Sequence, residues 1–116
     1  MATFSKEFLS ASYNGRPIQI GAIATPGTLI HTAVDGYESM DEVWIYAVNN
    51  SASDVTLTVE FGSVGESDKL TYSVLTDVGL ALVIPGSIIR AGQPISAYAG
   101  VADVVNVIGW VNRITI

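Results

Sequence analysis

The chain offers few residues that could carry out chemistry, and its histidine is the first to consider. His31 is the only histidine, and it lies between Ile30 and Thr32 in a segment expected to be a β-strand. A catalytic histidine needs a nucleophile on one side and an orienting acid on the other, and the sequence places neither beside it. With no cysteine, the usual ligands of a zinc site are also lacking. We therefore expect His31 to be a surface residue or a hydrogen-bonded core residue.

The densest group of carboxylates consists of four acids within eight residues, namely Asp35, Glu38, Asp41 and Glu42. Oxygen ligands on one loop suit calcium, but the EF-hand pattern of alternating acids around a central glycine is absent. We expect a solvated acidic loop, with a calcium site as the alternative. A glycosidase would need two acids across a cleft, which a sequence alone does not show.

Motifs for phosphate binding and glycan attachment are equally weak. Neither of the glycine-rich phosphate-binding patterns occurs. The segment Asn49-Asn50-Ser51 matches the N-glycosylation pattern, but the first residues lack a charged-then-apolar signal region. We therefore expect no catalytic residues, no cofactor and no metal, and we predict that the protein is not an enzyme.

Charge and composition narrow the class of partner. The chain has 116 residues and a net charge of −6, which argues against binding to nucleic acid and to anionic membranes. No apolar run approaches the length of a membrane-spanning helix. Charged residues make up only 14% of the chain, against roughly 25% in typical domains. Much of the surface must therefore be uncharged, and a large exposed apolar patch usually marks a partner.

The stretch at residues 40–62 organises the elements that would position these residues. It is expected to form a strand, a polar turn and a second strand. Residues 55–61 alternate between apolar and polar, which is typical of a strand with one buried face. Residues 42–48 are apolar on both faces, which indicates a central strand or a strand that meets a partner. Trp44 and Tyr46 share one face of that strand.

Alternating segments joined by Gly, Pro, Asn and Asp turns predict about eight strands in all. The other expected strands lie at residues 16–24, 28–34, 68–75, 80–84, 95–99 and 104–116. The run at 80–84 is apolar throughout and ends at Pro85, which predicts a fully buried strand. Gly109 is expected to bend the last strand. We predict a single all-β domain, an antiparallel, jelly-roll-like β-sandwich, with an immunoglobulin-like sandwich around a buried Trp44 as the alternative.

The first residues are expected to form an arm, at residues 1–12, that precedes the sandwich domain at residues 13–116. The spacing of Phe4, Phe8 and Leu9 predicts that they share one face of a short helical turn. Three large apolar residues indicate that the arm packs on the domain or on a neighbour. The large aromatic residues are expected in the core or at a subunit interface. The predicted partner-interface residues are Phe4, Phe8, Leu9, Trp44, Tyr46 and Trp110.

Three stretches of the chain resemble a family of small structural proteins of tailed bacteriophages. They are LIHTAV at 29–34, DEVWIYAVNNSASDVTLTVEFG at 41–62 and GWVNRI at 109–114. The resemblance implies a capsid decoration (cement) protein, many copies of which bind the major capsid protein on the outer surface of the phage head. It also implies a place in the virion, synthesis in the host cytoplasm and no catalytic residues.

Two other functions stay open beside head decoration. One is a neck or tail component that forms a ring, and the other is a carbohydrate-binding module with an exposed aromatic platform. For a decoration protein we expect a homo-oligomer, favouring a trimer with its seam in the strands of Trp44 and Trp110. We also expect that removing residues 1–12 weakens binding to the shell while the domain stays folded.

Overall fold

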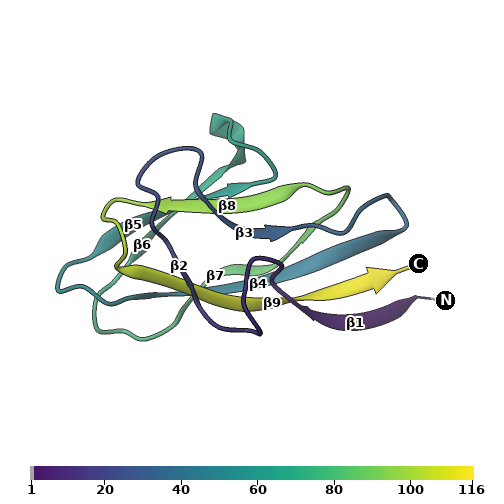
Figure 1. Cartoon of the computed structure of the whole chain (residues 1–116), viewed down its shortest axis with the longest axis horizontal. Helices are drawn as coiled ribbons and strands as arrows, with labels where there is room; N and C mark the ends of the chain where they lie inside the picture. The colour runs from purple at the N-terminus through teal and green to yellow at the C-terminus, as the bar shows by residue number, and fades with distance from the viewer. Residues whose placement is uncertain (1) are drawn as a thin grey trace.

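The structure is a computed structural model that describes residues 2–116, and it consists of two antiparallel β-sheets packed face to face (Figure 1). Sheet A has the strand order β1-β9-β4-β7, with β2 also paired to β9, and sheet B has the order β3-β8-β5-β6. The elements are β1 (Thr3–Phe8), β2 (Ile18–Gln19), β3 (Thr28–Thr32), β4 (Ser39–Asn49), β5 (Val55–Phe61), the 3-10 turn η1 (Glu66–Asp68), β6 (Lys69–Val74), β7 (Ala81–Ile89), β8 (Pro94–Ala99) and β9 (Val105–Thr115). The predicted all-β sandwich is confirmed.

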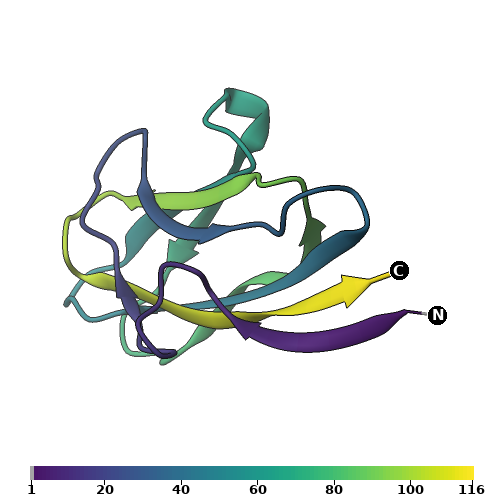
Figure 2. The same cartoon turned by 45° about the vertical axis from the view of Figure 1, so that its right-hand side comes forward.

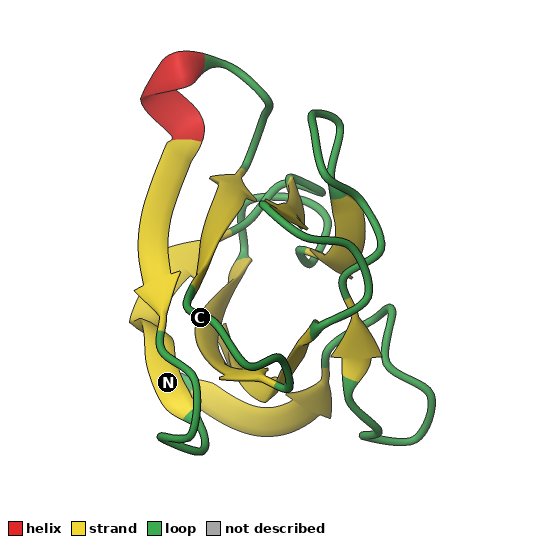
Figure 3. Cartoon of the chain, turned by 90° about the vertical axis from the view of Figure 1, so that its left-hand side faces the viewer, coloured by secondary structure: helices red, strands yellow, loops and turns green. Residues whose placement is uncertain are grey.

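The strand pairing is that of a jelly roll. β5 and β6 form a hairpin. The strands before and after this hairpin pair in turn, β4 with β7, β3 with β8 and β2 with β9, so that the chain forms one long two-stranded ribbon. Rolling this two-stranded ribbon brings β9 beside β4 and β8 beside β5, which produces the two layers. The strands of both layers surround a common interior (Figure 3). β1 lies outside the ribbon, because it adds to β9 beyond the residues that pair with β2.

The interior is filled by alternate residues of both sheets. In β4, Val43, Ile45 and Ala47 are fully buried, whereas Trp44 and Tyr46 face outwards and are half-buried. β4 pairs with β9 on one side and β7 on the other, so its predicted central position is confirmed. The alternative with Trp44 as the buried centre of an immunoglobulin-like sandwich is wrong, because this side chain lies on the outer face.

The N-terminal segment is a strand and not the predicted helical turn. Phe4 and Phe8 lie opposite Ile114 and Trp110 of β9, because residues four apart share a face of a strand as well as a face of a helix. Leu9 does not share that face, since it is buried in the core. The exposed arm therefore ends at Phe8 and not at residue 12.

Two further predicted strands differ from the observed ones. The segment predicted at 16–24 contributes only Ile18–Gln19 as β2, because the chain then crosses from sheet A towards sheet B. The run at 80–84 is not fully buried, since Leu82 is 43% exposed on β7. β7 continues through Pro85, which an edge strand tolerates because its outer backbone groups have no ladder partner.

Gly109 allows two central strands to approach closely. The register of β9 against β4 continues without a shift through Gly109, which lies opposite Ile45, so no β-bulge against β4 lies at this residue. A Cβ atom on Gly109 would lie 1.9 Å from the carbonyl oxygen of Trp44. Only glycine therefore fits between these strands without moving them apart.

We predict that Gly109→Ala lowers the free energy of unfolding by at least about 2 kcal/mol, because overpacking forces the backbone to shift. Gly100→Ala is the matched control, since a Cβ there would meet its nearest atom, the carbonyl oxygen of Thr56, at 3.9 Å. Urea unfolding followed by tryptophan fluorescence measures both variants. Equal stabilities would contradict the close approach described here.

Candidate functional site

The outer face of sheet A is the candidate functional site. β1, β9, β4 and β7 all contribute to it, and the register places Phe8, Trp110 and Trp44 opposite one another across three strands. We call this surface the aromatic face. Its apolar side chains are Phe4, Phe8, Met40, Trp44, Tyr46, Val48, Leu82, Ile88, Ile108, Trp110 and Ile114.

Three nearly parallel rings form the centre of the aromatic face. The ring of Trp110 lies 6.2 Å from that of Trp44, with 15° between the planes, and 6.0 Å from that of Tyr46, with 27°. The indole N–H of Trp44 donates to Glu42 at 2.9 Å, and the ammonium group of Lys6 lies 5.2 Å from the centre of the Trp110 ring. Stacking and the cation–π contact fix the orientation of the rings, although all three stay half-exposed.

An open groove of about 700 Å³ lies beside these rings, a volume typical of ligand-sized sites. Phe8, Tyr46, Ile108 and Trp110 provide apolar walls, and Lys6 is among the few charged groups that line it. The groove can therefore accept an apolar side chain of a partner or the face of a sugar ring.

The aromatic face carries little charge. Of the charged residues on its four strands, only Lys6 and Glu42 share the outward face of Trp44 and Trp110, although the chain as a whole has a net charge of −6. The core of a protein interface is depleted of charged residues in the same way. This surface therefore has the composition of an interface core.

The structure brings together five of the six residues predicted to contact a partner. Phe4 and Phe8 are 66% and 62% exposed on the aromatic face, and they lie beside the three central rings. Leu9 is the exception, because it is buried in the core and cannot contact a partner in this conformation. Contact of the other five with a partner stays a prediction.

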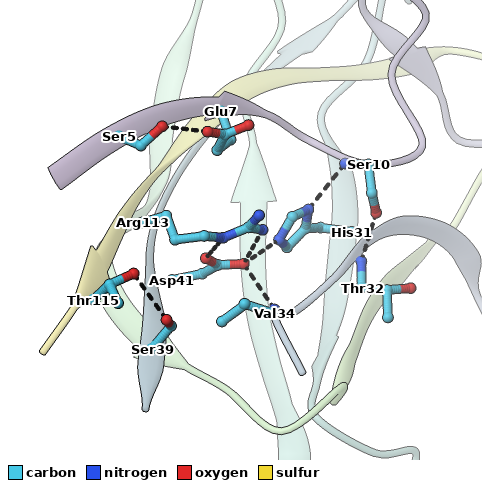
Figure 4. A network of polar contacts seen from close by, with 10 residues as sticks. All are labelled: Ser5, Glu7, Ser10, His31, Thr32, Val34, Ser39, Asp41, Arg113 and Thr115. Atoms are coloured by element: carbon cyan, nitrogen blue, oxygen red, sulfur yellow. Dashed lines mark hydrogen bonds and ion pairs between the residues drawn. The ribbon is translucent and has the colours of Figure 1, made fainter. Parts of the chain in front are cut away.

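The histidine and one of the clustered acids form a buried network between the two sheets (Figure 4). Asp41 is fully buried and accepts hydrogen bonds from Arg113 Nε at 2.7 Å, Arg113 Nη2 at 3.1 Å and the backbone N–H of Val34 at 3.1 Å. His31 Nε2 lies 2.8 Å from the same carboxylate, and the backbone N–H of Ser10 donates to His31 Nδ1 at 2.9 Å. These partners assign the neutral tautomer with its proton on Nε2.

The expectation of a hydrogen-bonded core histidine is confirmed. Both ring nitrogens of His31 are occupied by the protein's own groups, and the ring is buried. The hydroxyl of Ser10 does not contact the ring, since it accepts the backbone N–H of Thr32 at 2.7 Å. The arrangement orients β3 against β4 and leaves the histidine no side-chain nucleophile as a partner.

The four clustered acids do not form one solvated loop. Asp35 and Glu38 are exposed in the loop before β4, but Asp41 and Glu42 belong to β4 and point to opposite faces of sheet A. The carboxylate of Asp41 already binds Arg113 and cannot turn towards the loop acids. Within residues 2–116 no group of three or more acids, histidines or cysteines is placed to hold a metal ion.

The segment that matches the glycosylation pattern is a turn. The side-chain amide of Asn49 is buried and donates to the carbonyl oxygens of Ser53 at 2.7 Å and Val74 at 2.9 Å. Its Oδ1 accepts the backbone N–H of Ser51 at 2.9 Å. Asn49 is therefore a structural residue that closes the turn between β4 and β5, and its amide nitrogen is not accessible in the folded protein.

Glu60 is a second buried carboxylate, although the alternation at residues 55–61 predicts that it lies on the solvated face of its strand. The loop before β3 covers it: Gly27 N–H donates at 2.7 Å, and the Thr25 hydroxyl also donates to the carboxylate. Ser96 Oγ completes the set at 2.8 Å. A Cβ on Gly27 would lie 2.5 Å from the backbone of Ala97, so this residue has to be glycine for the loop to lie so close.

Comparisons of the chain with protein-family models, curated proteins and solved structures found no match. In the described part of the chain, no helix is long and apolar enough to cross a membrane. The aromatic face and the buried polar groups are therefore the features of the molecule that bear on its function.

Both buried carboxylates make the folded state sensitive to acid. Burial raises the pKa of Asp41, but the hydrogen bonds from Arg113, His31 and Val34 outweigh burial and hold the pKa below its ordinary value. Burial likewise raises the pKa of Glu60, and its hydrogen bonds again outweigh burial and lower the pKa. A carboxyl whose pKa is depressed by folding stabilises the protein above its unfolded pKa of about 4, and the stabilisation is lost as the pH falls through the folded pKa.

We predict that the free energy of unfolding begins to fall as the pH drops below about 5 and keeps falling until the pH has passed the depressed pKa values of these carboxyls in the folded protein. Asp41→Asn should cost about 3–5 kcal/mol at pH 7, because it leaves the buried part of Arg113 without its counter-charge. The free energy of unfolding of this variant should also depend less steeply on pH, and the dependence that remains should be due to Glu60. The exposed Glu38, changed to Gln, is the control, and urea titrations across this pH range measure all three proteins. An unchanged slope in Asp41→Asn would contradict the assignment.

Proposed function

We propose that this chain is a non-enzymatic structural protein of a bacteriophage virion, a capsid decoration (cement) protein that binds the assembled head. The observation that carries the proposal is the aromatic face, an exposed apolar sheet face on an otherwise acidic chain. Such a surface usually marks a protein interface. The resemblance of the segments at 29–34, 41–62 and 109–114 to structural proteins of tailed phages supports the head as its location and the major capsid protein as its partner.

The size of the aromatic face supports a stable contact. β1, β9, β4 and β7 have 6, 11, 11 and 9 residues; with about 3.3 Å per residue and about 4.8 Å between strands, their flat area is about 600 Å². Specific protein interfaces bury about 600–1,000 Å² on each partner. The stacked rings are already oriented, so binding would cost little of their side-chain entropy.

The buried polar groups support a structural role over a catalytic one. His31, Asp41 and Glu60 bind other groups of the same chain, and all three are removed from solvent. Their contacts hold strands and a loop in place. The groups that the aromatic face offers to a partner are mainly rings and aliphatic side chains, which suit docking.

We predict that the purified protein co-sediments with empty shells assembled from the major capsid protein encoded with it, and not with unassembled subunits. Ile88→Lys should weaken this binding strongly, because it places a charge within the apolar contact, on the edge strand β7. Val64→Lys is the matched control outside the aromatic face, since Ile88 and Val64 are 57% and 49% exposed. Equal shell binding by the two variants, or binding to free subunits alone, would contradict the proposal. Recovery with the neck or tail fraction instead would favour the ring-forming alternative.

The geometry of the rings supports carbohydrate binding as a second candidate. Trp44, Trp110 and Tyr46 are nearly parallel and half-exposed beside the groove, and sugar rings pack on aromatic faces of this kind. We would titrate the protein with a panel of soluble oligosaccharides and follow tryptophan fluorescence. A saturable change that is lost in Trp110→Ala would favour this function over decoration.

A further inference from the structure

β1 is the strand of sheet A that the body holds least. Each of its six side chains is exposed or half-exposed, and β9 is its pairing partner. Thr3 and Ser5 point towards the sandwich side of the sheet and are nevertheless exposed, because sheet B does not extend over this part of sheet A. Figures 1 and 2 show β1 running along the edge of the molecule beside the end of β9. β1 therefore has one neighbouring strand and no covering layer, so little burial of apolar surface holds it in place.

The chain becomes firmly fixed immediately after β1. Leu9 is buried in the core, and the next residue, Ser10, donates its backbone N–H to His31 and accepts the N–H of Thr32 on its hydroxyl. The N–H of Ala11 donates to the carbonyl oxygen of Ile30 at 3.1 Å. The boundary between the weakly and the strongly held parts therefore lies between Phe8 and Leu9. If the backbone changes direction there, the contacts of Leu9 and Ser10 with the body are kept.

We propose that β1 is exchanged between copies of this chain, so that Thr3–Phe8 of one copy pairs with β9 of a second copy. The same residue pairs would form in either arrangement, including Phe8 opposite Trp110. The contact of Lys6 with the Trp110 ring would form as well. Exchange therefore loses none of the contacts of β1. Exchange of an identical element is a low-cost route to homo-oligomers.

The topology and the charges of β1 fit a second copy as its partner. β1 is not part of the rolled ribbon of β2 to β9, so its departure leaves every pair of that ribbon in place. The charges of Lys6 and Glu7 cancel, so the strand adds no net charge to a neighbour of net charge −6. The six residues of β1 span about 20 Å when extended, and all of this length lies along β9 of the second copy, so the two bodies meet where Phe8 joins Leu9. The exchange joins copies of the chain and does not rest on the proposed function.

Cysteine crosslinking tests the exchange directly, because the chain contains no cysteine. Lys6 and Asn112 lie opposite each other in the register of β1 and β9. We would unfold Lys6→Cys and Asn112→Cys together, refold the mixture and oxidise it. We expect a disulfide-linked dimer at least about tenfold more abundant than with Lys6→Cys and Thr56→Cys, because paired strands hold the thiols at a high effective concentration. Thr56 is an exposed residue of sheet B and serves as the control.

The double variant Lys6→Cys/Asn112→Cys in one chain distinguishes the two arrangements. Exchange predicts disulfides between chains, whereas a strand retained by its own chain gives a disulfide within one chain that migrates as a monomer. A monomeric full-length protein in native mass spectrometry, or heterodimer no more abundant than in the control, would overturn the proposal. Crosslinking of β1 only to a capsid subunit would overturn it as well.

Deletion of β1 provides a second measurement. Removing residues 1–7 should convert the oligomer into a folded single chain, because Leu9 and Ser10 remain to fill the core and to bind His31. Removing residues 1–12 deletes both of these contacts, so the earlier expectation of a folded remainder is revised, and we expect that variant to unfold. An oligomer that persists after removal of residues 1–7, with cooperative unfolding, would show that another surface joins the copies.

Discussion

The hydrogen bonds of Asp41 are the contact on which the arrangement of the two sheets depends. Asp41 and Arg113 belong to sheet A and His31 to sheet B, so one carboxylate connects both layers inside an otherwise apolar sandwich. His31 then extends the connection to Ser10, directly after β1. Removing any member would leave a buried polar group without its partner. The network therefore fixes the position of β3 relative to β4 and anchors the chain at the point where β1 begins to separate from the body.

The molecule combines two buried carboxylates with an exposed apolar face, both of which are unusual beside its otherwise apolar core. Asp41 lies between the sheets and Glu60 lies under the loop before β3, both with hydrogen-bond partners, while Phe4, Phe8 and Ile88 face solvent. The interior networks specify one arrangement of the strands. The exterior face, which contributes little to folding in a single copy, is where contact with another molecule would remove apolar surface from water.

The sequence predicts this fold well where one strand face is buried and the next is solvated. The alternation at 55–61 locates β5 at its observed bounds, and the same alternation separates Val43 from Trp44. Asp41 lies on the same face of β4 as Val43, so the alternation also predicts its burial, although the three acids nearby favour a solvated loop. The alternation does not predict the burial of Glu60, because that burial depends on a loop distant in sequence that folds over it. Spacing alone could not separate strand from helix for β1, since residues four apart share a face in both.

The position of β9 has a consequence for biosynthesis. β9 is the last strand of the chain in order of translation, yet it lies in the interior of sheet A between β4 and the pair β1 and β2. Until residues 105–115 have left the ribosome, β4 lacks one of its neighbours and β1 and β2 have no strand to join. Chains dominated by distant pairings fold slowly and expose strand edges while they wait. During this interval the nascent chain presents Trp44 and Tyr46 on an unfinished sheet, so the surface that suits assembly in the folded protein is also the one that a chaperone would first encounter.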